Sequence, residues 1–272
     1  MICLIGTTKD VLFFVQHIHI KLTQLGLVNK VHTTEKMAAP MTTVIKKQVI
    51  TEDLGKICEK AVCLVAGCEF QGNYKYSLEK ANALKMRLTS ITTEIQGFQH
   101  TGRTDDLYDF SHSTDVTKKL SVKTNKTGWM VCPQGGQGTK KTFCEKFSLS
   151  FEAQTDPEAI KAFVVATVPK ILDTFMHSTF HCQTLYYNEP ANLVLLIKQI
   201  KPIDWSIQPL KFSHLEKVKI WNESTTLYLS HNGTLITIGE FQNHKNRNCF
   251  KFRWQFKNLL DHFKNHFEIR TL

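Results

Sequence analysis

The sequence predicts one domain of the α/β or α+β class, in which helices flank a central mixed β-sheet. The chain has 272 residues, of which 42% are hydrophobic, and this is enough to bury a sizeable core. Helical patterns come first, and strand patterns mixed with further helices follow them. The Asn232-Gly233 pair between two β-rich runs is a strong signal for a hairpin within the sheet.

Apolar residues that recur at spacings of three and four predict the helices. The predicted helices are 52–68, 78–96, 156–176 and 255–268. Thr51 can cap the first of them, and acidic residues occupy its first turn. Asp156 can cap the third helix with Pro157 at its first position, and Pro169 is expected to end or kink it.

Short runs rich in β-branched and aromatic residues predict the strands. They are 106–110, 119–124, 193–200, 225–230, 234–241 and 250–254. The stretches 97–102 and 111–117 read as turns. Residues 133–139 form a glycine-rich loop that lacks the spacing of a phosphate-binding P-loop.

Several classes of protein are excluded by the composition. No run approaches the roughly 18–20 apolar residues of a membrane span, and no signal peptide precedes the domain. The eight cysteines include no CxxC pair, which favours reduced thiols over a disulfide framework or a zinc site. The sequence therefore predicts a soluble, intracellular, cytoplasmic protein without contact to a membrane.

The positive charge is concentrated in two segments. The formal net charge is +10. Residues 118–146 contain seven Lys against one Glu, and residues 243–272 contain seven basic against two acidic residues. Such concentration indicates a polyanionic partner, for which nucleic acid is the leading candidate.

One pair of predicted strands brings together residues that can hydrolyse a phosphodiester. If 106–110 and 119–124 pair as an antiparallel hairpin, acids of the first strand come level with the second. Alternation then places Ser121 and Lys123 on one face, because residues two apart share a side. A carboxylate can hold Mg²⁺, and a lysine can orient or deprotonate the attacking water. The candidate metal ligands are Asp105 and Asp106, with Asp109 ranked third.

These residues resemble the motif of the PD-(D/E)xK nuclease superfamily, and within it the type II restriction endonucleases. Thr104-Asp105 matches the P-D element, and Ser121-Val122-Lys123 matches the (D/E)-x-K element with Ser at the second acidic position. Some restriction enzymes complete such a site with an acid from a preceding helix. Glu59, within the Leu54–Lys60 run LGKICEK, is the matching residue here. The resemblance implies a restriction-endonuclease-like core at about 52–146.

The resemblance also implies roles for residues outside the catalytic set. Glu59, Asp105 and Asp106 would ligate Mg²⁺, and the catalytic residues would be these three with Ser121 and Lys123. Lysines near the cut would neutralise phosphates, and amide or guanidinium groups would read bases. The candidate DNA-binding residues are Lys126, Gln134, Gln137, Lys140, Lys141, Gln242, Asn243, His244 and Arg247.

The leading hypothesis is a Mg²⁺-dependent, sequence-specific endonuclease of double-stranded DNA, acting as a homodimer beside a cognate DNA methyltransferase. The alternatives are a DNA repair or recombination nuclease of the same superfamily, or a nucleic-acid-binding protein without catalysis. Residues 1–36 are expected to be an N-terminal extension. The single domain would then span 37–272, with a DNA-binding part at about 190–272.

Overall fold

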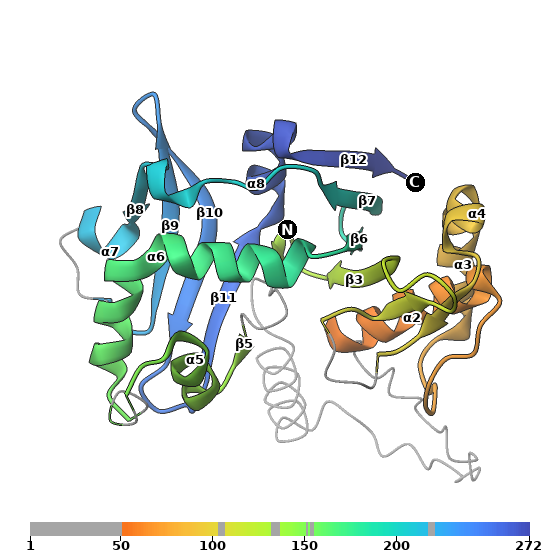
Figure 1. The fold of residues 1–272 in the computed structure, drawn as a ribbon, viewed down its shortest axis with the longest axis horizontal. Coiled ribbons are helices and arrows are strands. Elements are labelled where there is room, and N and C mark those ends of the chain that lie inside the picture. The colour runs from red at the N-terminus through yellow and green to blue at the C-terminus, as the bar shows by residue number, and fades with distance from the viewer. Residues whose placement is uncertain (1–50, 103–106, 132–136, 151, 153–154, 217–220) are drawn as a thin grey trace, which may run out of the picture. The chain divides into compact units, whose positions relative to one another are not determined.

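Two β-sheets organise the part of the chain that the structure describes (Figure 1). The computed structural model describes residues 51–102, 107–131, 137–150, 152, 155–216 and 221–272. They belong to one compact unit, Gln48–Leu272. The α/β class is confirmed, but the strands form two sheets rather than the single central sheet expected from the sequence.

The first sheet is mixed, with the strand order β1-β2-β3-β6-β7-β12. Its strands are β1 Phe98–His100, β2 Phe110–His112, β3 Lys119–Asn125, β6 Gln183–Asn188, β7 Leu193–Gln199 and β12 Phe267–Thr271. Strands β3 and β6 are parallel, and every other neighbouring pair in this sheet is antiparallel. A parallel pair needs a long crossover, and the segment between β3 and β6 supplies it.

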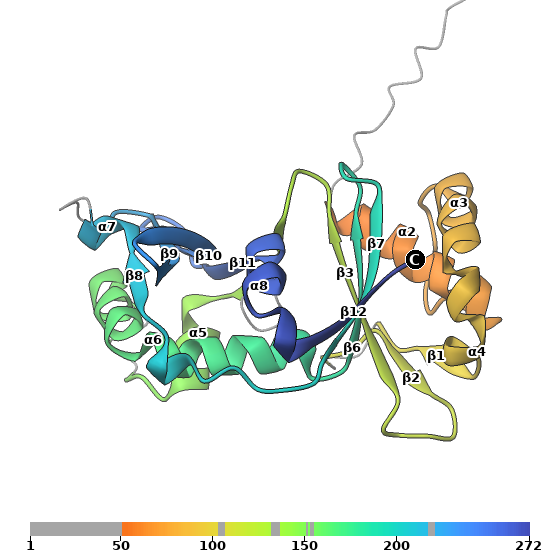
Figure 2. The same cartoon turned by 90° about the horizontal axis from the view of Figure 1, so that it is seen from above.

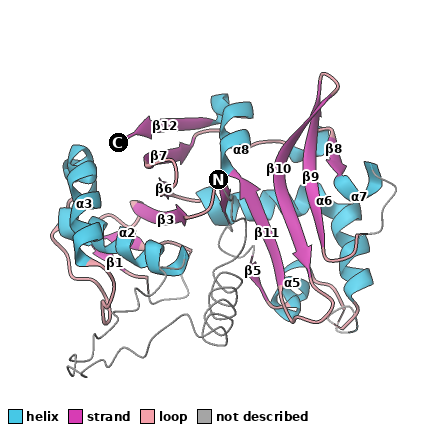
Figure 3. Ribbon diagram, turned by 180° about the vertical axis from the view of Figure 1, so that it is seen from behind, coloured by secondary structure: helices cyan, strands magenta, loops and turns pink. Residues whose placement is uncertain are grey.

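The second sheet is antiparallel, with the order β4-β11-β10-β9-β8 and with β5 also paired to β11 (Figure 3). Its strands are β4 Met130–Val131, β5 Gln137–Gly138, β8 Leu210–Phe212, β9 Ser224–His231, β10 Thr234–Asn243 and β11 Phe250–Gln255. The Asn232-Gly233 hairpin is confirmed between β9 and β10, and both residues have positive φ. The local hairpin therefore fixes the centre of this sheet.

The helices cover the two sheets separately. They are α2 Thr51–Ala66, α3 Leu78–Leu88, α4 Thr92–Ile95, α5 Lys140–Phe147, α6 Pro157–Phe180, α7 Ser213–Glu216 and α8 Phe256–His262. Within the described ranges, 3₁₀ turns lie at Thr89–Ile91, Trp205–Ile207 and Lys264–His266. Helix α2 packs on β3 and α3 packs on α2, and the buried side chains between them form one core cluster (Figure 2). Helix α6 and the aromatic face of the second sheet form the other. No described helix has the length and apolar character needed to cross a membrane.

Helix α6 confirms that Pro169 kinks a helix rather than ending it. The backbone leaves helical geometry at Thr167, with φ −127° and ψ 20°, and the helix then continues to Phe180. Proline cannot donate the hydrogen bond to the preceding turn. At the kink the Thr167 hydroxyl donates to the carbonyl oxygen of Phe163, four residues before it, at 2.7 Å.

Several local predictions were wrong: the strand expected at 106–110 lies at Phe110–His112, and the helix expected at 78–96 ends at Leu88. Two more concern β1 and β12. Residues 97–102 were expected to be a turn, but Phe98–His100 forms β1 because its backbone pairs with β2. The helix expected at 255–268 ends at His262, and Phe267–Thr271 forms β12 on the edge of the first sheet beside β7. The spacing of Leu259, Phe263 and Phe267 fits a helix. The backbone at Phe267 is nevertheless extended, because it pairs with β7, a strand far away in the sequence.

The second sheet supplies a stability prediction at Gly239, which lies at a bulge between β9 and β10. A Cβ there would come within 2.4 Å of Cζ of Phe252 and 2.8 Å of the Arg253 carbonyl oxygen. We expect Gly239→Ala to lower the free energy of unfolding by about 1–3 kcal/mol, since overpacking forces these neighbours apart. Urea unfolding followed by circular dichroism measures it.

The matched control is Gly55→Ala in α2, where the nearest atom to a new Cβ would be Oγ1 of Thr124 at 3.8 Å. We expect that variant to be as stable as the unmodified protein or about 0.5–1 kcal/mol more stable, because alanine favours helix. Equal stability of the two variants would contradict the packing argument.

Candidate active site

The β2–β3 hairpin places the carboxylate of Asp109 against β3. The Asp109 amide donates to the Leu120 carbonyl oxygen at 3.0 Å, and Phe110 pairs with Leu120 in register. Oδ2 of Asp109 accepts the Val122 amide at 2.6 Å and the Ser121 hydroxyl at 3.3 Å. The antiparallel hairpin predicted from the sequence is thus confirmed, with Asp109 as the described acid that it brings level with β3.

Ser121 and Lys123 share one face of β3, as the alternation predicted. Nζ of Lys123 donates to Oγ of Ser121 at 2.8 Å, and the two residues are 7% and 0% exposed respectively. Leu120 and Val122 point to the other face, into the core beneath α2. Ser121 therefore links the lysine to Asp109 through one continuous chain of hydrogen bonds.

Burial shifts the pKa values of Asp109 and Lys123, the two ends of this chain of hydrogen bonds. It raises the pKa of Asp109, which Glu59 raises further and Lys123 lowers. It also lowers the pKa of Lys123, against the opposing effect of Asp109 and Glu59. Two carboxyl groups and one amine thus act on one another in a site with little water, where their interactions are strong.

Glu59 joins this cluster from α2. Its Oε2 lies 2.8 Å from Nζ of Lys56 and 2.8 Å from Nε2 of His100, and its Oε1 lies 3.0 Å from the same Lys56 nitrogen. The apolar stripe of α2, including Ile57 and Cys58, is buried in the core. That packing fixes the helix and leaves Glu59 near enough to raise the pKa of Asp109, the residue directly before β2.

His100 was not found from the sequence. It lies in β1, in a stretch that read as a turn, and no motif marked it. Only the pairing of β1 with β2 brings it to Glu59, which lies 41 positions earlier in the chain. A strand assignment at 98–100 would have been the one available signal, because it puts Phe98 and His100 on one buried face.

Further polar side chains border the cluster. Lys119 shares the face of Ser121 by alternation, and its Nζ lies 4.3 Å from the ring centroid of Tyr108. The His181 ring centroid lies 6.3 Å from that of Tyr108. Burial lowers the pKa of His181, and neighbouring cationic groups including Lys123 lower it further. Both ring nitrogens of His181 are buried without a hydrogen-bond partner among the described residues, so they do not reach solvent.

Several predicted site residues lie outside the described residues. Asp105, Asp106 and Gln134 are among them, so their roles stay predictions. The main chain of Gln137 pairs with Lys251 in the second sheet, and its side chain is not described.

The predicted DNA-binding residues on and around the second sheet fall into two groups, one with buried and one with exposed side chains. Nζ of Lys140 donates to the His244 carbonyl oxygen at 2.9 Å, and Nδ2 of Asn243 donates to the Pro157 carbonyl oxygen at 3.1 Å. Both side chains are buried. Lys141 and Arg247 are exposed. The Lys140 contact also brings parts of the two basic segments side by side.

The remaining candidates are partly buried. Nδ1 of His244 lies 3.1 Å from Oε2 of Glu223, and Nε2 of Gln242 donates to Oε1 of Glu240 at 3.2 Å. Lys126 follows β3 directly. These groups can reach a ligand only by exchanging or extending their present contacts.

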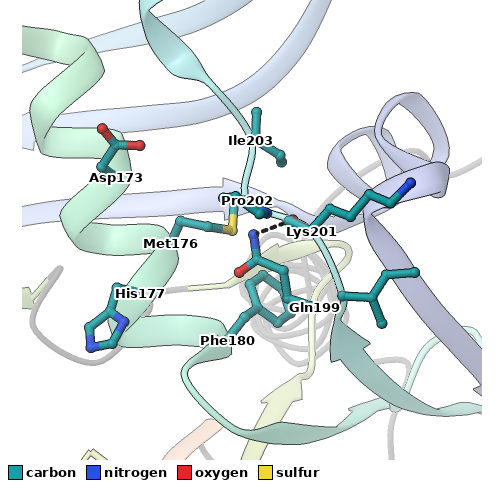
Figure 4. Close-up of a pocket in the computed structure, with 9 residues that line it drawn as sticks. Asp173, Met176, His177, Phe180, Gln199, Lys201, Pro202 and Ile203 are labelled. Atoms are coloured by element: carbon teal, nitrogen blue, oxygen red, sulfur yellow. Dashed lines mark hydrogen bonds between the residues drawn. The ribbon is translucent and has the colours of Figure 1, made fainter.

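A separate pocket lies between the last turns of α6 and the segment after β7 (Figure 4). Asp173, Met176 and His177 line it from the helix, and Lys201 lines it from the opposite wall. Nε2 of Gln199 donates to the Lys201 carbonyl oxygen at 3.1 Å. It shares no lining residue with the Asp109–Lys123 chain of hydrogen bonds.

The oxygen donors of the cluster suit a hard divalent cation. Among the described residues no three His, Cys, Asp or Glu side chains group as a metal site. Glu59 and Asp109 nevertheless act on each other as like charges in a buried place, as the raised pKa of Asp109 reflects. Mg²⁺ often binds proteins through one or two carboxylates and retains several waters. The residues present therefore fit Mg²⁺, and the fit rests on two carboxylates.

One comparison with known proteins bears directly on this arrangement. The chain is 38% identical over 226 residues to the type II restriction enzyme CviAII of Paramecium bursaria Chlorella virus 1. The similarity covers 82% of this chain and 64% of CviAII, so the chain spans somewhat less than two thirds of that enzyme's length. No protein-family model matches the chain, and no solved structure matches it.

Similarity to a type II restriction enzyme agrees with the resemblance that the sequence motifs predicted. The similar region is long enough to exceed the predicted core at about 52–146.

Proposed function

We propose that this protein is a Mg²⁺-dependent type II restriction endonuclease of the PD-(D/E)xK superfamily, which cuts double-stranded DNA at a specific short sequence. The observation that carries the proposal is the continuous contact from Lys123 through Ser121 to Asp109, with Glu59 beside it. Similarity to CviAII supports the same reaction class.

In this proposal Asp109 takes the place of the P-D acid, and Ser121-Val122-Lys123 is the second element. Asp109 and Glu59 would hold Mg²⁺. When bound, the ion would neutralise charge on the phosphate and make a water more acidic. Asp105 and Asp106, which the sequence ranked ahead of Asp109, lie outside the described residues and remain candidates for the first acid.

Lys123 would act on the attacking water. Because burial lowers the pKa of its amine, less free energy is needed for Lys123 to give up and regain a proton than for an exposed lysine. Ser121 holds the amine in place through its hydroxyl. The water oxygen would bond to phosphorus while one P–O ester bond breaks. Lys123 would take the proton that the water loses, the protonated amine would stabilise the growing negative charge, and the leaving oxygen would take up a proton from solvent.

The basic groups outside the cluster would bind DNA. Lys126, Lys141 and Arg247 are accessible or partly accessible and would contact phosphates or base edges. Gln242 and His244 would join them after exchanging their present partners. A homodimer would cut both strands of a palindromic site, and a partner DNA methyltransferase would protect the host's own sites.

Incubating the purified full chain with plasmid DNA and Mg²⁺ tests the proposal, with excess EDTA as the control. We expect discrete fragments with Mg²⁺ and none with EDTA. A smear would indicate a nuclease without sequence specificity, such as a repair enzyme. Binding without cleavage, under varied salt and with Mg²⁺ or Mn²⁺, would favour the non-catalytic alternative and overturn the proposal.

A further inference from the structure

Glu59 is held by two donors of different kinds. Lys56 approaches both of its carboxylate oxygens from a side chain that is 28% exposed, whereas the His100 side chain is 1% exposed. A partly exposed lysine side chain can rotate away from the carboxylate at a small cost in free energy. A buried ring cannot, so His100 is the permanent partner of Glu59.

The hydrogen bonds of His100 determine which ring nitrogen carries the proton. The main-chain N–H of Gln71 donates to Nδ1 at 2.9 Å, so Nδ1 is an acceptor. In the neutral ring the proton then lies on Nε2, which donates to Oε2 of Glu59 at 2.8 Å. The loop at Gln71 thus sets the tautomer that Glu59 requires.

The groups packed around the His100 imidazole hold it in one position. The ring of Phe70 stacks on it with centroids 4.5 Å apart, and the ring of Phe110 packs at 5.0 Å. The backbone at Gly102 covers the bond so closely that a Cβ there would lie 2.8 Å from Nε2 and 3.2 Å from Oε2 of Glu59. Only glycine fits at this position without displacing the pair.

His100 also connects the two acids of the cluster through β1. The residue after it, Thr101, donates its amide to the carbonyl oxygen of Asp109 at 2.8 Å. Phe110, the neighbour of Asp109, is the register partner of His100. The strand that orients Glu59 is therefore bonded to the residue that presents the other carboxylate.

We propose that His100 is a positioning residue, which fixes Oε2 of Glu59 so that Oε1 faces a divalent cation once Lys56 moves away. This inference rests on the proposed function only for the identity of the cation site. Hydrogen bonds of this kind to a metal ligand orient the ligand, and their loss lowers metal affinity about 10–100-fold.

Two amide substitutions test the two hydrogen bonds of the His100 ring one at a time. His100→Gln can keep a donor near the position of Nε2 and loses the acceptor for Gln71. His100→Asn can keep the acceptor near the position of Nδ1 and loses the donor to Glu59. Glu59→Gln serves as the reference for a damaged metal ligand. Thermal melting of each variant reports whether the fold is retained.

Mn²⁺ binding is measured by electron paramagnetic resonance of the free ion, alongside the Mg²⁺ concentration that gives half-maximal plasmid cleavage. We expect His100→Asn to weaken Mn²⁺ binding at least tenfold more than His100→Gln does, and to raise the Mg²⁺ requirement in parallel. Equal Mn²⁺ affinities of the two variants, or weaker Mn²⁺ binding by His100→Gln than by His100→Asn, overturn the inference. So does Mn²⁺ affinity that Glu59→Gln leaves unchanged, or an unmodified protein that binds no Mn²⁺. If the expected order of Mn²⁺ affinities is found but the unmodified protein never cuts DNA, only the proposed nuclease function fails.

Discussion

Replacing Lys123 with methionine is expected to reduce DNA cleavage about 10³-fold or more while DNA binding is nearly preserved. In the proposed mechanism the buried amine would exchange a proton with the attacking water and also stabilise the charge of the phosphate. Methionine keeps most of the buried stem, so the packing of β3 should survive. Plasmid cleavage under single-turnover conditions and a DNA-binding titration at several salt concentrations give the two quantities.

Lys126→Ala is the matched control, because this lysine follows the same strand and is a candidate phosphate contact. We expect it to weaken binding, to lower the salt slope by about 1, and to leave cleavage at saturating DNA unchanged. If Lys123→Met behaved like Lys126→Ala, Lys123 would be only a phosphate contact and the catalytic assignment would be wrong.

Asp109→Asn is expected to abolish Mg²⁺-dependent cleavage, with a loss of about 10³-fold. The amide keeps the shape of the side chain but lacks the negative charge that a divalent cation requires, and such charge stabilisation contributes several kcal/mol. Oδ1 of the amide can still accept from the Val122 amide, so the hairpin should remain folded.

Asp105→Asn and Asp106→Asn decide which acid serves as the first element of the motif. If Asp109 is that acid, both variants should cut within about tenfold of the unmodified protein, since neither removes the carboxylate bonded to Val122 and Ser121. If instead one of them lost cleavage while Asp109→Asn kept it, the assignment would move to that residue. The same plasmid assay, with thermal melting as the check on folding, distinguishes these outcomes.

The local parts of the site could be predicted from the sequence. Alternation along β3 put Ser121 and Lys123 on one face, and the structure confirms this through their 2.8 Å contact. Glu59 was proposed from the resemblance of the LGKICEK run to restriction enzymes. The shared face of Ser121 and Lys123 depends only on residues within one strand, where the repeat of two determines the direction of each side chain.

The choice of acid could not be made in the same way. Asp105, Asp106 and Asp109 differ by a few positions, and a shift of one residue in pairing moves a side chain to the other face. The strand expected at 106–110 is observed at Phe110–His112, so Asp109 is the residue directly before this strand. Pairing of Phe110 with Leu120 then aims it at β3.

By itself, then, the sequence determined the α/β class, the β9–β10 hairpin, and a lysine and a hydroxyl on one strand face beside a helix that carries Glu59. Tertiary structure alone decided that the strands form two sheets, that 267–271 is a strand, and that His100 meets Glu59. The physical reason is that local patterns fix where side chains point within an element. Hydrogen bonds between segments far apart in the chain decide which elements become neighbours, and no local pattern encodes them.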